Sequence, residues 1–135
     1  LVGSEMCIRD RGNMIRDFTF IDDIIEGVFR VIFKTATPDI NFNKSKPNSS
    51  SSWAPYRIFN IGNSKPTSLM EYIREIENAL NIKAKINFLP MQMGDVKRTY
   101  ADTDALDSWI EYKPNTSIKE GVKKFIVWYR RFYNK

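Results

Sequence analysis

The fold is decided by the stretch Arg16-Asp17-Phe18-Thr19-Phe20-Ile21-Asp22-Asp23-Ile24-Ile25-Glu26-Gly27-Val28. Apolar and polar residues mix in a β-compatible run from Met14 to Phe20, and apolar residues then recur at helical spacing. The pattern predicts a short strand over 14–20 followed by a helix over 21–34. Carboxylates in the first helical turns suit the positive end of the helix dipole, so Asp22, Asp23 and Glu26 are interpreted as structural rather than as a catalytic pair.

Arg16 stands at the edge of this predicted strand and not on a solvated helix face. A guanidinium there can hold two phosphate oxygens at once, a geometry that lysine cannot reproduce. An internal ion pair with a nearby aspartate is the alternative. Spacing alone leaves both interpretations open.

Strands and helices alternate along the rest of the chain, which predicts an α/β fold. About three strands are too few for an independent doubly wound sheet, so we expect part of a larger sheet whose backbone edge at 57–61 is normally paired elsewhere. Serines at two helix starts form capping-box patterns with a glutamate three residues later. The expected elements are strands over 57–62 and 85–89, and helices beginning at Ser68, near Asp104 and at Ser117.

Residues 36–55 have no apolar period and contain the run Ser49-Ser50-Ser51-Ser52. This composition predicts a surface loop, and its length is unusual for a bare connection inside a compact domain. We therefore expect an insertion that covers a site or meets a partner.

Length and net charge limit the classes of protein and of partner that are possible. A chain of 135 residues is one domain or a piece of a larger one. The sequence contains no run of about 18 apolar residues, so it predicts no membrane-spanning helix. The net charge of +5 favours anionic partners, which include nucleic acid, a membrane surface and a phosphorylated small molecule. Charge does not choose among these three.

Residues 1–11 are treated separately, because Leu1-Val2-Gly3-Ser4-Glu5-Met6-Cys7-Ile8-Arg9-Asp10-Arg11 is neither signal-like nor periodic. One reading frame of a widely used transposase-library adaptor encodes the first ten residues. We interpret this leader as adaptor-derived and exclude it from fold reasoning; a native disordered leader is the alternative.

The only cysteine is Cys7, and the chain has no histidine. This composition argues against a disulfide framework or a zinc site, and it favours a reducing, cytoplasmic location.

A second group of polar and apolar residues lies between Asn87 and Asp102. Gly94 permits a backbone turn, and Asp95 offers two acceptor oxygens suited to a ribose diol. The apolar segment from Phe88 to Met91 could pack beside a base. An ordinary loop with Asp95 as a turn residue is the other interpretation.

Taken together, these motifs resemble the extended short-chain dehydrogenases/reductases, the NAD-dependent epimerase/dehydratase family, and within it the UDP-glucuronate 4-epimerases. The resemblance implies the C-terminal part of an extended Rossmann-type nucleotide-sugar epimerase, with an incomplete sheet and a small substrate-binding α/β subdomain. Residues 12–62 would complete the dinucleotide-binding fold, and residues 63–135 would form the substrate-binding region. The matching segments are 16–24, Pro55-Tyr56-Arg57-Ile58-Phe59-Asn60-Ile61-Gly62-Asn63, Leu89-Pro90-Met91-Gln92-Met93-Gly94-Asp95-Val96 and Thr99-Tyr100-Ala101-Asp102.

The resemblance also implies roles for individual residues. Arg16 would contact the UDP diphosphate and Asp95 the uridine ribose, while the nucleotide pocket would be lined by Phe88, Leu89, Pro90, Met91 and Gln92. The parent enzyme would hold NAD, form a homodimer and convert UDP-glucuronate to UDP-galacturonate.

The residues that carry the family's chemistry are not found in this sequence. The family needs a Gly-rich strand-to-helix turn for the NAD pyrophosphate and a Tyr-x-x-x-Lys pair for proton transfer. Tyr72 is followed four positions later by Ile76, and Tyr100 by Asp104. We therefore expect no catalytic residue and no metal site here, an NAD site upstream, and an inactive fragment.

Two other functions remain open at this point. One is a nucleotide-sugar dehydratase or decarboxylase of the same superfamily. The other is a non-enzymatic basic module that binds nucleic acid through exposed aromatics near the end of the chain, such as Trp128 and Phe132. Helical spacing favours core packing for most of these aromatics, so we expect a UDP-sugar and not nucleic acid or a membrane as the partner.

Overall fold

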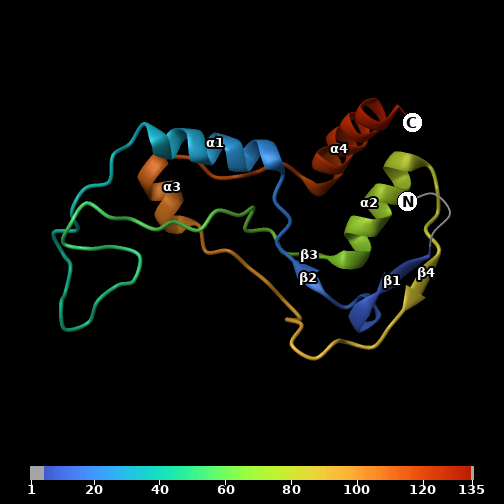
Figure 1. Cartoon of the computed structure of the whole chain (residues 1–135), viewed down its shortest axis with the longest axis horizontal. Helices are drawn as coiled ribbons and strands as arrows, with labels where there is room; N and C mark the ends of the chain where they lie inside the picture. Colours follow the sequence, from blue (N-terminus) through green and yellow to red (C-terminus); the bar gives the residue numbers. More distant parts are fainter. Residues whose placement is uncertain (1–4, 135) are drawn as a thin grey trace.

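The computed structural model describes residues 5–134, and its helices and strands lie in two groups (Figure 1). In one group α1 (Ile21–Ile32) lies across α3 (Asp104–Ile110). In the other, α2 (Leu69–Leu80) lies beside the strands, and α4 (Ile118–Tyr133) packs against α2. The chain is therefore a mixed α/β structure, as the alternation of patterns predicts.

The strands form two separate pairs within the described part of the chain. β1 (Met6–Ile8) pairs in parallel with β4 (Ile86–Phe88). β2 (Ile15–Arg16) pairs antiparallel with β3 (Thr67–Ser68). A one-turn 3₁₀ helix, η1 (Arg9–Gly12), joins β1 to the segment that leads into β2. Two short pairs do not make a domain-sized sheet, which confirms the expected incomplete sheet.

The helix starts follow the sequence signals. The Ser68 hydroxyl accepts the Glu71 N–H at 3.1 Å, and the Ser117 hydroxyl accepts the Glu120 N–H at 3.2 Å. Each bond satisfies one of the backbone donors that a helix start leaves free. α1 begins at Ile21 as predicted and ends two residues before the predicted limit.

The main core lies between α2 and α4. Ile73 on α2 is buried, as are Val122 and Ile126 on α4. Phe125 belongs to the same apolar period of α4, but 46% of it is exposed. The apolar period of this helix therefore does not make all of its members buried.

Two predicted strands are shorter than their apolar runs. The strand expected over 14–20 is limited to β2, and residues 57–62 form no strand except an isolated bridge between Arg57 and Ser51. A strand is defined by its hydrogen-bonded neighbour, and residues 58–62 have no neighbouring strand in the part of the chain described.

The leader enters the fold. Met6–Ile8 forms β1, and Ile8 is buried. Its carbonyl accepts the Leu89 N–H at 2.7 Å. Residues 6–8 of the leader therefore take part in the fold, contrary to the expectation that residues 1–11 lie outside it. Residues 1–4 lie outside the described part, and the adaptor origin stays a prediction.

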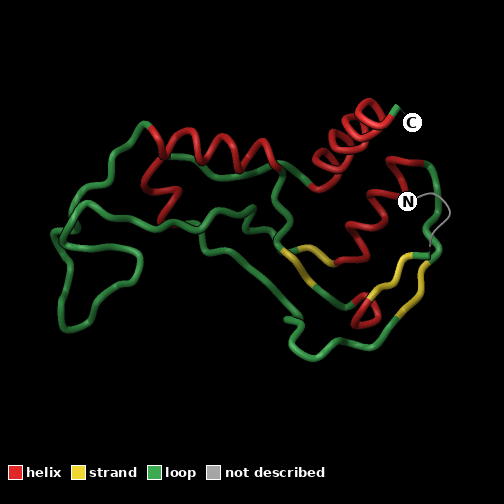
Figure 2. The backbone as a smooth tube through the Cα atoms, viewed as in Figure 1, coloured by secondary structure: helices red, strands yellow, loops and turns green. Residues whose placement is uncertain are grey.

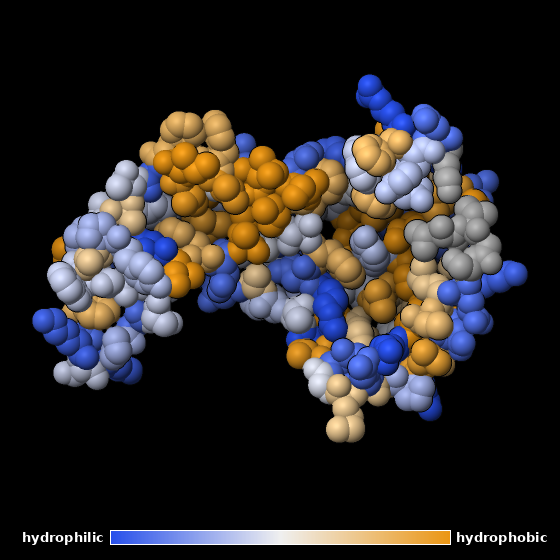
Figure 3. All heavy atoms as spheres, viewed as in Figure 1, coloured by the Kyte–Doolittle hydropathy of each residue, from blue (hydrophilic) through white to orange (hydrophobic). Residues whose placement is uncertain are grey.

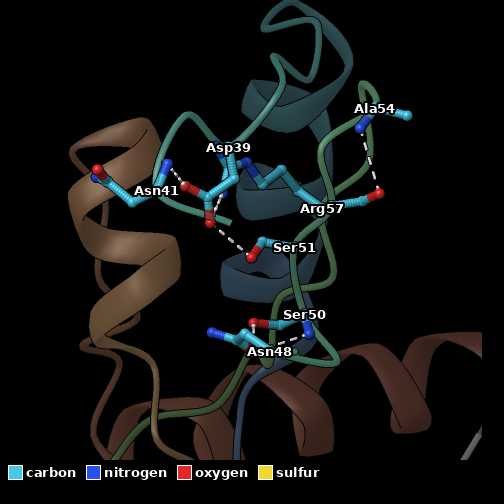
Figure 4. A network of polar contacts seen from close by, with 8 residues as sticks. Asp39, Asn41, Asn48, Ser50, Ser51, Ala54 and Arg57 are labelled. Atoms are coloured by element: carbon cyan, nitrogen blue, oxygen red, sulfur yellow. Dashed lines mark hydrogen bonds and ion pairs between the residues drawn. The ribbon is translucent and has the colours of Figure 1, made fainter. Parts of the chain in front are cut away.

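The 36–55 insertion contains neither helix nor strand (Figure 2). A polar cluster nevertheless gives it a fixed shape (Figure 4). The buried Ser51 hydroxyl donates to Asp39 Oδ2 at 2.7 Å, and Arg57 Nη1 lies 3.6 Å from the same oxygen. The cluster closes the loop against the chain that follows it.

Candidate functional site

Arg16 is held between two segments that are distant in sequence. On one side it pairs with Thr67 of β3. On the other, Ile15 forms a bridge with Arg98: the Ile15 N–H donates to the Lys97 carbonyl at 3.0 Å, and the Thr99 N–H donates to the Ile15 carbonyl at 3.2 Å. Backbone bonds on both sides therefore fix the position of Arg16.

The guanidinium of Arg16 has only neutral partners among residues 5–134. Its Nη1 donates to the Ile15 carbonyl at 2.9 Å and to the Lys97 carbonyl at 3.3 Å, and Nη2 lies 3.3 Å from the sulfur of Met14. None of the ion pairs in this part of the chain includes Arg16. The internal ion pair, which the sequence left open, is not formed, so the charge is available to an anionic ligand.

Asp17, the nearest aspartate in sequence, is occupied elsewhere. Its carboxylate accepts backbone N–H groups from Ser64 at 3.0 Å, Ala101 at 3.3 Å and Lys65 at 3.4 Å. These bonds tie the end of β2 to two loops. This role of Asp17 is not predictable from the sequence, because a run of alternating residues does not indicate which backbone groups an aspartate will contact.

The second predicted group of site residues begins where β4 ends. Phe88 is the last residue of β4 and is half exposed, whereas Leu89 is held by backbone bonds to Ile8 and Arg11. Pro90 and Gln92 are exposed, and Met91 is partly buried. The segment therefore places both apolar and polar side chains at the surface.

A tight turn precedes Asp95. The Asp95 N–H donates to the Gln92 carbonyl at 3.2 Å, and Gly94 has a φ of +89°, a conformation that favours glycine. Asp95 borders a cavity of about 340 Å³ that is otherwise mostly apolar, between β1 and α2. Other residues that line this cavity are Met6, Ile8, Met14, Leu69 and Tyr72.

The structure brings some of the predicted residues close in space and leaves others apart. Lys97 and Arg98 place the loop that contains Asp95 directly beside Arg16. No hydrogen bond joins the side chains of Arg16, Gln92 and Asp95 to one another in the described part of the chain. The sequence missed the Lys97 carbonyl as a support for Arg16, since a backbone acceptor leaves no residue-type signal.

Asp23 does not belong to this site. It is 8% exposed, and its carboxylate accepts hydrogen bonds from Tyr112, Asn115 and Thr116. Burial, followed by the Asp23 charge, raises the pKa of Tyr112 to about 12. Asp23 is therefore a structural residue, in agreement with the sequence interpretation, although its partners are side chains and loop backbone rather than the helix dipole alone.

No group of three histidine, cysteine, aspartate or glutamate side chains within residues 5–134 is placed to hold a metal ion. Over the same range, no helix combines the length and the apolar character needed to cross a membrane.

Comparison with known proteins decides the family. The model of the family described as GDP-mannose 4,6 dehydratase matches residues 2–125. The chain belongs to this family. Membership accounts for the mixed α/β architecture and confirms the resemblance to NAD-dependent epimerases and dehydratases.

Individual relatives agree with this assignment. Protein CapI of Staphylococcus aureus is 44% identical over 128 residues, which cover 95% of this chain and 38% of CapI. A probable UDP-glucuronate 4-epimerase of Rhizobium meliloti is 37% identical over 137 residues, covering 98% of this chain and 39% of that protein. The chain thus spans about two fifths of the length of these relatives.

A solved structure matches the fold as well. The UDP-glucuronic acid 4-epimerase of Bacillus cereus, in complex with UDP-glucuronic acid and NAD, superposes with a TM-score of 0.73 at 24% identity. The match covers 96% of this chain and 36% of the Bacillus chain. The elements described above therefore form part of the Rossmann-type epimerase fold.

Proposed function

We propose that this chain is the UDP-sugar-binding part of an NAD-dependent nucleotide-sugar epimerase that interconverts UDP-glucuronate and UDP-galacturonate. One observation carries the proposal: Arg16 is a cation without a carboxylate partner among the described residues, held by backbone bonds on both sides. Relatives named as UDP-glucuronate 4-epimerases support the choice of substrate.

In this proposal Arg16 binds the diphosphate. Its guanidinium offers several donors in one plane, which suits two phosphate oxygens. Neighbouring Lys97 and Arg98 add positive potential on the adjoining segment. Asp95 accepts hydrogen bonds from the ribose diol, and Gln92 with the residues from Phe88 to Met91 borders the base. Binding of this kind holds the sugar in position for reaction, which lowers a barrier only in the intact enzyme.

The residues of this chain do not fit NAD. The glycines of the described residues, at positions 12, 27, 62, 94 and 121, lie in five separate segments, so none of them forms the Gly-rich turn that a dinucleotide pyrophosphate needs. We therefore place the NAD site and the catalytic tyrosine and lysine of the parent enzyme outside this chain. The chain alone is proposed to be inactive.

UDP binding tests the proposal directly. We expect UDP to bind the chain, measured by calorimetry, and Arg16→Gln to weaken binding by about tenfold or more, because a charge-assisted bond contributes about 1.5–3 kcal/mol. Arg16→Lys should retain part of the affinity. Arg131→Gln, an exposed arginine on α4, is the matched control and should leave binding unchanged. Equal affinities for wild type and Arg16→Gln would refute the phosphate role.

The role of Asp95 has its own test. If its carboxylate holds the ribose diol, UDP should bind more tightly than 2′-deoxy-UDP, and Asp95→Ala should remove the difference. Asp102→Ala is a suitable control, since Asp102 accepts the Asp104 N–H at the start of α3. A preference for UDP that survives in Asp95→Ala would assign ribose recognition to another residue.

A dehydratase is the second candidate, because the matched family is described as GDP-mannose 4,6 dehydratase. Supplying the full-length parent with UDP-glucuronate in one assay, and with a GDP-sugar or UDP-sugar that carries a C6 hydroxyl in another, and identifying the products separates the two activities. UDP-galacturonate supports epimerisation, whereas a 4-keto-6-deoxy product from a GDP-sugar or UDP-sugar substrate supports dehydration.

Nucleic-acid binding is tested by competition. The expectation of core packing for the α4 aromatics is wrong for Trp128 and Phe132, which are about half or more exposed. An oligonucleotide that displaces UDP at low salt would therefore contradict the proposed partner. A cytoplasmic location and a homodimeric parent stay proposals, and sedimentation of the full-length protein tests the second.

A further inference from the structure

A second extended segment lies beside β2, on the side opposite β3. The Ile15 N–H donates to the Lys97 carbonyl at 3.0 Å, and the Thr99 N–H donates to the Ile15 carbonyl at 3.2 Å. These two bonds make Ile15 and Arg98 direct partners in a parallel bridge. Figure 3 shows hydrophilic residues over the middle of the molecule, where Figure 1 places β2, whereas apolar residues gather over α1. The register of the bridge determines which of these side chains share the face of Arg16.

This register separates Lys97 from Arg98. Side chains alternate between the two faces of extended backbone, and directly paired residues share a face. Arg98 therefore lies on the face of its partner Ile15. Lys97 and Thr99, one residue to either side of Arg98, lie on the opposite face together with Arg16. The two neighbouring cations of this segment thus differ in position, because only Lys97 shares the face of Arg16.

The face of Arg16 and Lys97 is also the side on which the Asp95 cavity lies. Met14 is 8% exposed, and its sulfur lies 3.3 Å from Arg16 Nη2. The same methionine lines the cavity of about 340 Å³ that Asp95 borders. Asp95 also precedes Lys97 by two positions in the same loop. A carboxylate that suits a ribose and two cations that suit phosphates therefore lie on one side of β2.

The charge of Lys97 has no carboxylate partner in the described part of the chain. Its side chain is exposed, and none of the ion pairs among residues 5–134 includes it. Each phosphate of a UDP-sugar is negatively charged, and the planar guanidinium of Arg16 suits the oxygens of a single phosphate. A lysine ammonium is a point charge on a flexible stem that also binds phosphate. A second cation on the face of Arg16 is therefore placed to meet the other phosphate.

From this geometry we propose that Lys97 is the second phosphate-binding residue of the UDP-sugar site. Arg16 and Lys97 each hold one phosphate of the diphosphate. Arg98, on the opposite face, contributes only to the general positive potential. The inference rests on the proposed function and extends it, because it names the two side chains by which the site distinguishes a diphosphate from a monophosphate.

Two neighbouring variants with the same change of charge test the contact. Lys97→Gln should weaken UDP binding by about fivefold or more in calorimetry, because a hydrogen bond to a charged group is lost. Arg98→Gln removes the same charge one position away and measures the effect of potential alone, which screening by salt should keep below about twofold. Lys97→Arg should retain most of the affinity. Both side chains are exposed, so the variants should unfold at the temperature of the wild type.

The number of phosphates in the ligand provides a second test. Only UDP offers a phosphate to each cation, so the wild type should bind UDP more tightly than UMP. Of Arg16→Gln and Lys97→Gln, one should remove this preference and so identify the residue that holds the terminal phosphate. The other should weaken the binding of both ligands by a similar factor. A preference for UDP that falls equally in both variants, or in neither, would overturn the assignment of one phosphate to each side chain.

The role of Lys97 and the proposed function fail in different ways. If Arg16→Gln weakens UDP binding and Lys97→Gln does not, the role of Lys97 is overturned and the proposed function stands. Equal losses in Lys97→Gln and Arg98→Gln also overturn that role, because they indicate a potential without a contact. If the wild-type chain, shown to be folded by circular dichroism, binds no UDP, the proposed function fails together with the role of Lys97.

Discussion

Asp23 binds Thr116 through both oxygens of its carboxylate. Oδ2 accepts the Thr116 N–H at 2.9 Å, and Oδ1 accepts the Thr116 hydroxyl at 2.9 Å. Tyr112 and Asn115 donate to the same carboxylate. This buried side chain therefore joins the first turn of α1 to the loop that leads into α4.

Replacing Asp23 by alanine should lower the free energy of unfolding by about 3 kcal/mol, because several buried donors lose their acceptor at once. Urea unfolding followed by circular dichroism measures the change. Asp22→Ala is the control: Asp22 lies on the exposed side of the same turn and should shift stability by less than about 0.5 kcal/mol. Similar losses in both variants would mean that helix electrostatics, and not the bonds of Asp23, stabilise this junction.

Tyr112 should make the fold sensitive to alkali. Burial, with a smaller contribution from the nearby Asp23 charge, raises the pKa of Tyr112 from its ordinary value of 10.0 to about 12. The unfolded chain loses this proton first, so stability should fall as pH rises from about 10 to about 12. Absorbance at alkaline pH should show one late-titrating tyrosine that Tyr112→Phe removes. A wild-type titration without a late component would contradict this environment.

The 36–55 loop should loosen in acid. The Ser51 hydroxyl, followed by the Asn41 N–H, lowers the pKa of Asp39 below its ordinary value of 3.8, despite the opposing effect of desolvation. A carboxylate with a lowered pKa stabilises the folded loop above the unfolded pKa, and this contribution is lost as pH falls through the folded pKa. Proteolysis of the loop by pepsin should therefore accelerate below that pH. Asp39→Asn should be cleaved quickly throughout the acidic range in which pepsin is active, whereas Asp102→Asn should behave as wild type.

Gly62 is a position where any side chain should be harmful. An added Cβ would lie 2.6 Å from the Ala101 Cβ and 2.8 Å from Asp17 Oδ2. Gly62→Ala should therefore cost about 2 kcal/mol of stability, since it displaces the carboxylate that holds three backbone donors. Gly94→Ala offers a comparison: space is open there, and only its positive φ opposes alanine, at a cost of about 1 kcal/mol. A larger effect at Gly94 than at Gly62 would argue against close packing around Asp17.

Local patterns in the sequence predicted the helices well. The serine and glutamate pairs at the starts of α2 and α4 act within one turn, so their bonds require no knowledge of the rest of the fold. Burial was harder to predict. Phe125 and Ile25 lie on apolar helical stripes, yet both are exposed, because periodicity shows that a face is apolar without showing what covers it.

The site was predictable only in part. Arg16 stood out because an arginine at the end of a strand is unusual, but its freedom from ion pairs depends on Asp17 turning to three backbone donors. The three donors lie 47, 48 and 84 positions after Asp17 in the sequence, in two different loops. The spacing of residues along the sequence does not predict such long-range contacts.

The position of β2 also has a kinetic consequence. Its neighbours are Thr67 and the segment at Lys97, and the bond between Arg16 and Lys97 spans 81 positions. Contacts of such high order require large loops to close first, whereas α2 and α4 can form from local turns. After dilution from denaturant, Arg16 should reach its place late, once the helices have already formed.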